Sequence, residues 1–201
     1  MKPLFIFDMG GVMVRNFSVW EKLPSLLEVN ETYLKAQSGL FYSMMRGEIS
    51  STEFFIILAH RLKREVPSEN YCSTLFHPEL IPESVELVTA LRQKGYRVVA
   101  GTNVLDVHYD YHMDHNDYQY FDKVYASHIM GVIKPELSFW QYILIQENRM
   151  EEWIGKEEYT FSDMYFFDDD IENVNAASSL GINAFLFTDA QKAKKELSLF
   201  I

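Results

Sequence analysis

The fold of this chain is constrained most by five short apolar segments. Each is followed by a longer, more polar stretch. They are residues 3–8, 96–101, 123–127, 164–168 and 183–187. Their length and nearly continuous apolar character are typical of strands buried on both faces. Most of the intervening stretches have helical spacing, as in residues 82–95 (Pro82 at the start, Gly95 at the end). Strands that alternate with helices predict an α/β fold, with a parallel sheet between two layers of helices.

Residues 17–79 interrupt this alternation. Apolar residues recur there at helical spacing, as in the run 53–59, and we expect no strand in this region. Ser51 or Thr52 is the expected N-cap of that helix. The predicted organisation is therefore a core made of residues 1–16 and 80–201, with a small helical domain, residues 17–79, inserted after the first strand. The polar stretch 151–162 is expected to be a loop.

Charge and composition narrow the class of partner. The net charge of −11 argues against a nucleic acid or an anionic membrane as the main partner, since both select basic surfaces. A phosphorylated small molecule remains possible, because a bound metal ion can override the global charge. The single cysteine excludes a disulfide framework and favours a cytoplasmic location. No apolar run approaches the ~18 residues of a membrane helix, and the sequence does not indicate an oligomeric state.

Polar side chains collect where the predicted strands end. Asp8 ends the first strand, Thr102 and Asn103 follow the second, Lys134 follows the third, and 168–170 end the fourth with three aspartates. Ligands of parallel α/β sheets bind beyond the carboxyl ends of the strands. We therefore expect these groups to meet at one edge of the sheet.

This combination of groups suits phosphoryl chemistry. Converging carboxylates raise each other's pKa, and a divalent cation such as Mg²⁺, which prefers oxygen ligands, removes that conflict. A lysine supplies a compact positive charge for the attacking carboxylate and the phosphoryl oxygens. Transfer of a phosphoryl group requires mainly positioning and charge neutralisation. Glycines beside Asp8 let the backbone approach a ligand closely.

In this order the motifs resemble those of the haloacid dehalogenase (HAD) superfamily, over nearly the whole chain. The matching segments are FIFDMGGVM (Asp8), VVAGTN (Thr102), GVIKPE (Lys134) and FFDDDIENVNAASSLGI (Asp168, Asp169, Asn173). The resemblance implies a three-layer, Rossmann-like core, and the insert 17–79 lies where subclass I members carry a helical cap. Within it, MRGEISSTEF resembles a cap loop that contacts substrate in sugar-phosphate members. The pattern is most similar to the bacterial α-D-glucose-1-phosphate phosphatase type.

The resemblance implies a phosphatase that hydrolyses a small phosphorylated metabolite, such as a hexose 1-phosphate. Asp8 would attack phosphorus and form an aspartyl-phosphate. Thr102 and Asn103 would bind the phosphate, and Lys134 would balance the charge. Arg46, in the cap loop, either clamps a substrate oxygen or is an ordinary surface arginine.

The same resemblance implies a Mg²⁺ ion beside the nucleophile. Its ligands would be the Asp8 carboxylate, the backbone carbonyl of Gly10 and Asp169, with Asp168 in or near the coordination shell. The helix that follows the aspartates is compatible with this role, because its N-terminus also favours negative charge.

Gly10 departs from the pattern of most phosphatases of the superfamily, which carry there a second aspartate that acts as general acid and base. Such assistance is typically worth about 10²–10⁴ in rate. Three interpretations remain. The substrate has a leaving group that needs little protonation, as in the glucose-1-phosphate phosphatase group, which also has glycine here. Alternatively, the chain is a metal-independent 2-haloacid dehalogenase, or a weakened relative that binds a ligand or partner.

The stretch 106–122 is rich in histidine and aspartate. His108 and His112, four residues apart, would share one face of a helix, with His115 near. Transition-metal binding is conceivable, but we favour a polar helix and loop at the rim of the site, because no matching ligand set is identifiable elsewhere.

Overall fold

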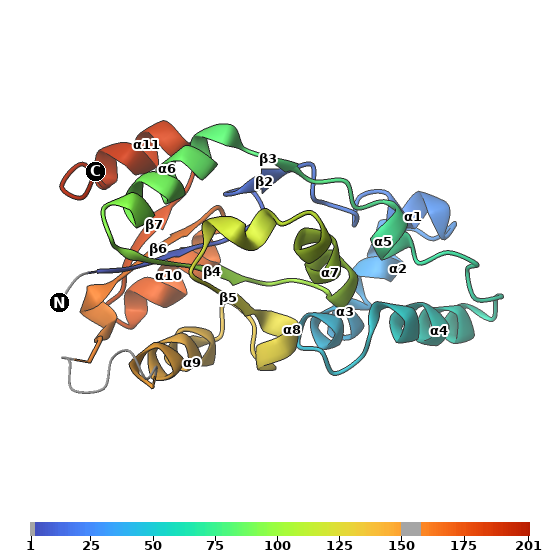
Figure 1. The fold of residues 1–201 in the computed structure, drawn as a ribbon. Coiled ribbons are helices and arrows are strands. Elements are labelled where there is room, and N and C mark those ends of the chain that lie inside the picture. The colour runs from blue at the N-terminus through green and yellow to red at the C-terminus, as the bar shows by residue number, and fades with distance from the viewer. Residues whose placement is uncertain (1–2, 150–157) are drawn as a thin grey trace.

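The computed structural model describes residues 3–149 and 158–201. Its centre is a five-stranded sheet in the order β5-β4-β1-β6-β7, with every neighbouring pair parallel (Figure 1). The strands are β1 (Leu4–Phe7), β4 (Arg97–Thr102), β5 (Lys123–Ala126), β6 (Met164–Asp168) and β7 (Asn183–Leu186). The predicted α/β fold with a Rossmann-like parallel sheet is therefore confirmed.

The two faces of this sheet pack against different helices (Figure 1). Successive side chains of a strand point to opposite faces, so Phe5 and Phe7 of β1 join one apolar core and Leu4 and Ile6 join the other. The first core includes buried residues of α6 (Pro82–Gln93) and α11 (Ala190–Glu196). The second includes those of α9 (Leu137–Asn148) and α10 (Ile171–Ser179). This double burial explains why the strands lack the apolar–polar alternation of a half-exposed sheet.

The connections at the carboxyl end of the sheet carry shorter elements. After β4 the chain forms α7 (Asp106–Asp114) and the 3-10 turn η1 (Asp117–Tyr120), and after β5 it forms α8 (Ser127–Met130). Within the polar stretch 151–162, expected to be a loop, residues 151–157 lie outside the described residues. The remainder includes the 3-10 turn η3 (Phe161–Asp163), directly before β6.

The predicted insert contains five described helices, which lie together at one end of the molecule (Figure 1). Their buried residues form a third apolar cluster, to which Leu105 before α7 also belongs. They are α1 (Leu23–Leu26), α2 (Glu31–Lys35), α3 (Ser38–Met45), α4 (Ser51–Leu62) and α5 (Tyr71–Thr74). The predicted caps of α4 are wrong by one or two residues: Ser50 is the N-cap and forms a capping box with Glu53. The precise division into core and cap domains stays a prediction.

A two-stranded ribbon joins this helical region to the core. β2 (Val14–Arg15) pairs antiparallel with β3 (Glu79–Leu80). The expectation of no strand within 17–79 is therefore wrong at its last residue, because two-residue strands leave no periodic signal in the sequence. The ribbon brings the two ends of the insert together beside the sheet.

Three contacts connect the helical region to loops and helices of the core. The backbone N–H of Ser51 donates to the Asp106 carboxylate at the start of α7, 3.1 Å away. Arg46, at the end of α3, forms an ion pair with Glu136. Gly47 has a φ of +69°, and a Cβ there would lie 2.1 Å from the carbonyl oxygen of His128. The chain therefore needs glycine at 47 for both its conformation and the close approach.

Across residues 3–149 and 158–201, none of the helices combines the length and apolar character that crossing a membrane requires.

Candidate active site

A buried lysine lies between two aspartates at the carboxyl edge of the sheet. Asp8 follows β1 and Asp168 ends β6, two strands that pair directly. Lys134 Nζ lies 2.8 Å from Asp8 Oδ1 and 2.6 Å from Asp168 Oδ2. All three side chains are buried. The predicted convergence of these groups is thus present, although they come from distant parts of the sequence.

Neighbouring polar groups fix this arrangement. Asp168 Oδ1 accepts hydrogen bonds from Asn173 Nδ2 at 3.0 Å and from the backbone N–H of Asp170 at 2.9 Å. The Asn103 side chain donates to the Lys134 carbonyl and accepts from the Lys134 N–H, both at 2.9 Å. This reciprocal pair ties the loop after β4 to the loop that carries the lysine.

Burial and neighbouring negative charges raise the pKa values of two carboxyl groups in this site. Burial, reinforced by the charges of Asp168 and Asp169, raises the pKa of Asp8 from 3.8 to about 7, although Lys134 opposes this rise. Burial and the neighbouring Asp168 also raise the pKa of Asp169. For Lys134, burial acts to lower the pKa, but the two adjacent carboxylates outweigh it and raise the value. One buried cation therefore incompletely compensates a concentrated negative charge.

The donor set fits a divalent cation. Asp8, Asp168 and Asp169 each offer a carboxylate oxygen, and these atoms lie within 4.8 Å of one another. Asp8 Oδ1 is buried and, apart from its ion pair with Lys134, accepts no hydrogen bond of good geometry. A Cβ at Gly11 would lie 2.0 Å from Asp169 Oδ2, so the carboxylate sits directly over the backbone there. An all-oxygen set of this kind suits Mg²⁺.

A cavity of about 310 Å³ opens over these groups. The predicted site residues that line it are Asp8, Gly10, Thr102, Asn103 and Asp169. Lys134 and Asp168 are buried beneath it: Lys134 contacts Asp8 on one side and Asp168 on the other. The structure does not bring Arg46 to this cavity wall; its guanidinium is paired with Glu136.

Two aromatic residues that the motifs did not identify complete the wall. Phe17 and Phe76 line the cavity together with apolar residues of the strand-end loops. Phe17 Cε2 lies 2.9 Å from where a Cβ of Gly10 would stand, so its ring covers the glycine. Neither aromatic residue belongs to a local pattern that would have revealed its position in the sequence.

Two histidines of α7 line the cavity, and the histidine at its C-cap lies at the surface. His108 and His112 line the cavity, whereas His115 is exposed. His108 Nε2 lies 2.8 Å from the Cys72 carbonyl oxygen, and its ring stacks on Phe76 with 3.7 Å between centroids. The four-residue spacing thus correctly indicated a shared face. Within the described residues, the only cluster of potential metal ligands is the acidic one.

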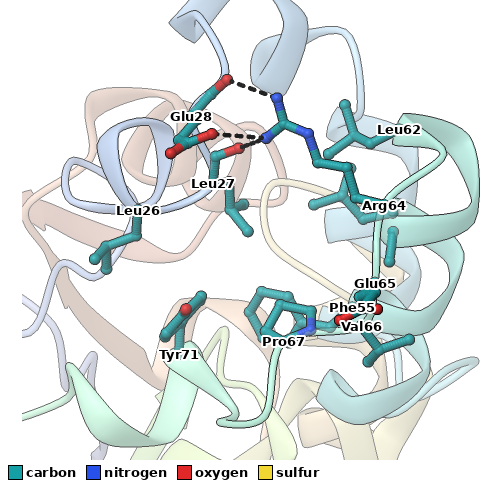
Figure 2. Close-up of a pocket in the computed structure, with 12 residues that line it drawn as sticks. Leu26, Leu27, Glu28, Phe55, Leu62, Arg64, Glu65, Val66, Pro67 and Tyr71 are labelled. Carbon is teal, nitrogen blue, oxygen red and sulfur yellow. Dashed lines mark hydrogen bonds and ion pairs between the residues drawn. The ribbon is translucent and has the colours of Figure 1, made fainter.

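A second cavity, of about 270 Å³, lies in the helical region (Figure 2). Its wall is largely apolar, with residues such as Leu62 and Tyr71, and it contains none of the predicted site residues. Arg64 lies at its edge, where it donates to the Leu27 carbonyl at 2.5 Å and faces Glu28 (Figure 2). Of these two cavities, the one over Asp8 therefore carries the candidate catalytic and metal-binding groups.

Curated relatives match almost all of this chain at modest identity. A sesquiterpene phosphatase of Aspergillus oryzae is 26% identical over 96% of this chain and 93% of the relative. Acyl-CoA dehydrogenase family member 10 of Mus musculus is 27% identical over 98% of this chain, which spans only 19% of that protein. A drimenol cyclase of Aspergillus calidoustus is 25% identical over 98% of this chain and 36% of its own length.

Solved structures share the fold. A HAD-like hydrolase from Porphyromonas gingivalis has a TM-score of 0.78 and 21% identity, with 98% of each chain covered. A HAD family enzyme from Bacteroides thetaiotaomicron, in complex with magnesium and inorganic phosphate, has a TM-score of 0.70 and 20% identity, with 92% of this chain and 93% of that one covered. The family model of the haloacid dehalogenase-like hydrolases matches residues 3–181. The chain therefore belongs to the haloacid dehalogenase-like hydrolases.

Proposed function

We propose that this protein is a Mg²⁺-dependent phosphatase that hydrolyses a small phosphorylated metabolite through an aspartyl-phosphate on Asp8. One observation carries the proposal: Asp8 lines a cavity while its carboxylate is held beside Lys134 and within 4.8 Å of two further carboxylates. If these aspartates served only to cap a helix, one carboxylate at the helix N-terminus would be enough. A paired nucleophile next to an acidic oxygen cluster is what phosphoryl transfer requires.

Each residue around the phosphoryl position has a distinct role in this proposal. Asp8 attacks phosphorus, and Lys134 balances the charge of the attacking carboxylate and of the phosphoryl oxygens. The Thr102 hydroxyl and the Asn103 backbone N–H bind phosphoryl oxygens from the end of β4. The Asn103 side chain is meanwhile occupied by the Lys134 backbone, so it acts by fixing the loops.

The metal would be held by Asp8, Asp169 and the Gly10 carbonyl, with Asp168 in or next to the shell. A bound Mg²⁺ would supply positive charge to the phosphoryl oxygens and relieve the repulsion between the carboxylates. Asp168 also accepts from Lys134, Asn173 and the backbone N–H of Asp170, so its main contribution is to fix the lysine.

The relatives support this assignment. The similar protein of Aspergillus oryzae is named as a sesquiterpene phosphatase, and the structurally similar enzyme of Bacteroides thetaiotaomicron was solved with magnesium and inorganic phosphate. The reaction proposed for this chain is argued from its own residues, Asp8, Lys134 and the acidic cluster.

Two substrate classes follow from different observations. The resemblance to the glucose-1-phosphate phosphatase type favours a hexose 1-phosphate, with Arg46 as a candidate sugar contact once it is released from Glu136. The cavity itself favours a phosphate ester of an apolar alcohol, because Met9, Phe17 and Phe76 form part of its wall. A panel containing hexose 1-phosphates and prenyl phosphates would separate the two classes.

The test is phosphate release from p-nitrophenyl phosphate, with Mg²⁺ and with EDTA, for the wild type and Asp8→Asn side by side. An aryl leaving group departs without protonation, so the glycine at position 10 matters least with this substrate. We expect Mg²⁺-dependent release that Asp8→Asn abolishes. Asp114→Asn, which removes an exposed carboxylate from α7, is the matched control and should retain activity.

Other outcomes identify the alternatives. Phosphate binding without any turnover by folded, Mg²⁺-loaded protein would indicate a ligand- or partner-binding relative. Release of halide from a 2-haloacid in EDTA would indicate a dehalogenase. Release that persists in Asp8→Asn would refute the role of Asp8.

A further inference from the structure

A buried histidine–aspartate pair lies at the wall of the active-site cavity. His112 Nδ1 is 2.7 Å from Asp117 Oδ2, and their side chains are 3% and 11% exposed. His112 comes from α7, and Asp117 begins the 3-10 turn that follows, after Asn116 reverses the chain with a φ of +57°. This turn is what allows Asp117 to reach back to the imidazole.

The geometry leaves the other nitrogen of the imidazole available. Within the described part of the chain, His112 makes one side-chain hydrogen bond, the one from Nδ1 to Asp117. His112 lines the cavity that Asp8 also lines, so Nε2 is the nitrogen free to meet a ligand there. A carboxylate on Nδ1 fixes the orientation of the ring and which nitrogen faces away from it.

Hydrolysis of a phosphate ester with a poor leaving group, such as an alkyl phosphate, is accelerated by a proton donor in the cavity. An alkoxide leaving group departs slowly unless it is protonated as its bond to phosphorus breaks. Gly10 offers no side chain, and the Phe17 ring occupies the space where one would begin, 2.9 Å from the Cβ position. A proton donor must therefore come from another part of the cavity wall.

The other titratable groups of the wall are already engaged. Asp8 and Asp169 belong to the nucleophile and the acidic cluster. Asp170 caps α10 by accepting from the Glu172 N–H at 2.8 Å. His108 is held at a backbone carbonyl through Nε2, and burial lowers its pKa to about 4. His112 is the group that remains.

We propose that His112, oriented by Asp117, is the general acid and base of this phosphatase. The inference rests on the proposed function. In the first step, an Asp8 oxygen bonds to phosphorus, the bond from phosphorus to the ester oxygen breaks, and that oxygen takes the proton of His112 Nε2. In the second, neutral His112 takes a proton from water as the water oxygen attacks phosphorus, which releases phosphate and the Asp8 carboxylate and restores protonated His112.

Several ionisable groups face this imidazole. Asp117 bonds it, His108 lies one turn earlier on α7, and the rings of Tyr111 and Tyr118 have centroids 5.9 and 5.4 Å from its own. Burial, then the nearby Tyr109 and Asp8, raise the pKa of the Tyr118 phenol. His112 and the nucleophile Asp8 line the same cavity.

The experiment compares two esters of similar size, p-nitrophenyl phosphate and benzyl phosphate, in wild type and His112→Ala. The nitrophenolate leaves without a proton, whereas the benzyl alkoxide needs one. We expect kcat/KM for benzyl phosphate, which reports the step in which the ester oxygen leaves, to fall about 10²–10⁴-fold, with a much smaller loss of kcat/KM for p-nitrophenyl phosphate. Added imidazole should restore benzyl phosphate hydrolysis, because the missing side chain leaves room for it beside the cavity.

The control is His115→Ala, an exposed histidine of the same segment whose Nδ1 contacts the Tyr111 carbonyl; it should hydrolyse both esters normally. Equal losses of kcat/KM on the two esters in His112→Ala, or no response to imidazole, would overturn the inference. If His112→Ala does not fold, Asp117→Asn tests the same point and should show the same selective loss for benzyl phosphate.

Failure of the proposed function gives a different pattern. If the wild type releases phosphate from neither ester, or if Asp8→Asn is as active as the wild type, the phosphatase proposal falls and the role of His112 falls with it. If the wild type hydrolyses both esters through Asp8 while His112→Ala lowers kcat/KM equally for both, only the histidine is excluded.

Discussion

Replacing Asp8 by asparagine should abolish activity and, at the same time, stabilise the metal-free protein above neutral pH. Two buried carboxylates share one lysine in the wild type. The neutral amide introduced by Asp8→Asn would leave Lys134 paired with Asp168 alone, which is a balanced buried pair. The nucleophile is thus a group whose ionisation opposes folding until a ligand compensates its charge.

The magnitude follows from the pKa of Asp8, which burial raises from 3.8 to about 7. Between these values the native state binds more protons than the unfolded chain, so the free energy of unfolding falls as pH rises and the full loss is reached above pH 7. The difference between the two pKa values corresponds to about 4 kcal/mol. Asp8→Asn lacks this ionisation and should avoid that loss.

The assay is denaturant unfolding in EDTA at several pH values from 5 to 8, for wild type, Asp8→Asn and the exposed control Asp114→Asn. We expect the stability advantage of Asp8→Asn over wild type to grow with pH, toward about 4 kcal/mol. Asp114→Asn reports the effect of net charge alone and should show no comparable growth. An Asp8→Asn advantage that stays constant from pH 5 to 8 would refute the reasoning.

Two further predictions concern the helical region and its contact with α7. Gly47→Ala should destabilise the protein by more than about 1 kcal/mol, because φ is +69° and the new Cβ would overlap the His128 carbonyl. The control is Gly39→Ala, because a Cβ at this position of α3 meets open space; it should stabilise the protein by about 0.5–1 kcal/mol. Thermal unfolding measures both variants, and equal changes in their melting temperatures would contradict the account. Burial lowers the pKa of His108 from 6.5 to about 4. Between these two pH values the unfolded chain binds more protons than the native state, so the free energy of unfolding should fall by up to about 3 kcal/mol as the pH drops from 6.5 to 4. Unfolding of His108→Gln between pH 7 and 4 should lack that part of the loss, and an unchanged slope would exclude His108 as its source.

The sequence was informative wherever a local pattern carries the physical signal. Residues 3–8 and 164–168 were recognisable as strands because continuous apolar runs report burial on both faces, and β1 and β6 occupy them. Asp8 and Lys134 were predictable because parallel strands deliver their carboxyl ends to one edge. Boundaries were less certain: the cap of α4 lies at Ser50, because the residue where the chain leaves the helix depends on its tertiary path.

Other features depend on distances that no local pattern encodes. Phe17 covers Gly10 because of the path of the chain after β1, and nothing in its sequence neighbourhood indicates that contact. Asp117 reaches His112 only because the chain reverses between them. Arg46 could be named as a candidate from its motif, but its partner Glu136 lies 90 residues away in the sequence.

The central claim is that Asp8 carries the phosphoryl group during turnover. The most direct test is to quench the Mg²⁺-loaded wild type during turnover of p-nitrophenyl phosphate with hydroxylamine, which converts an acyl phosphate into a hydroxamate, and to map the modification by peptide mass spectrometry. The account predicts a hydroxamate at Asp8, formed only when both substrate and Mg²⁺ are present. Turnover without modification of Asp8, or with the modification on another carboxylate, would contradict it.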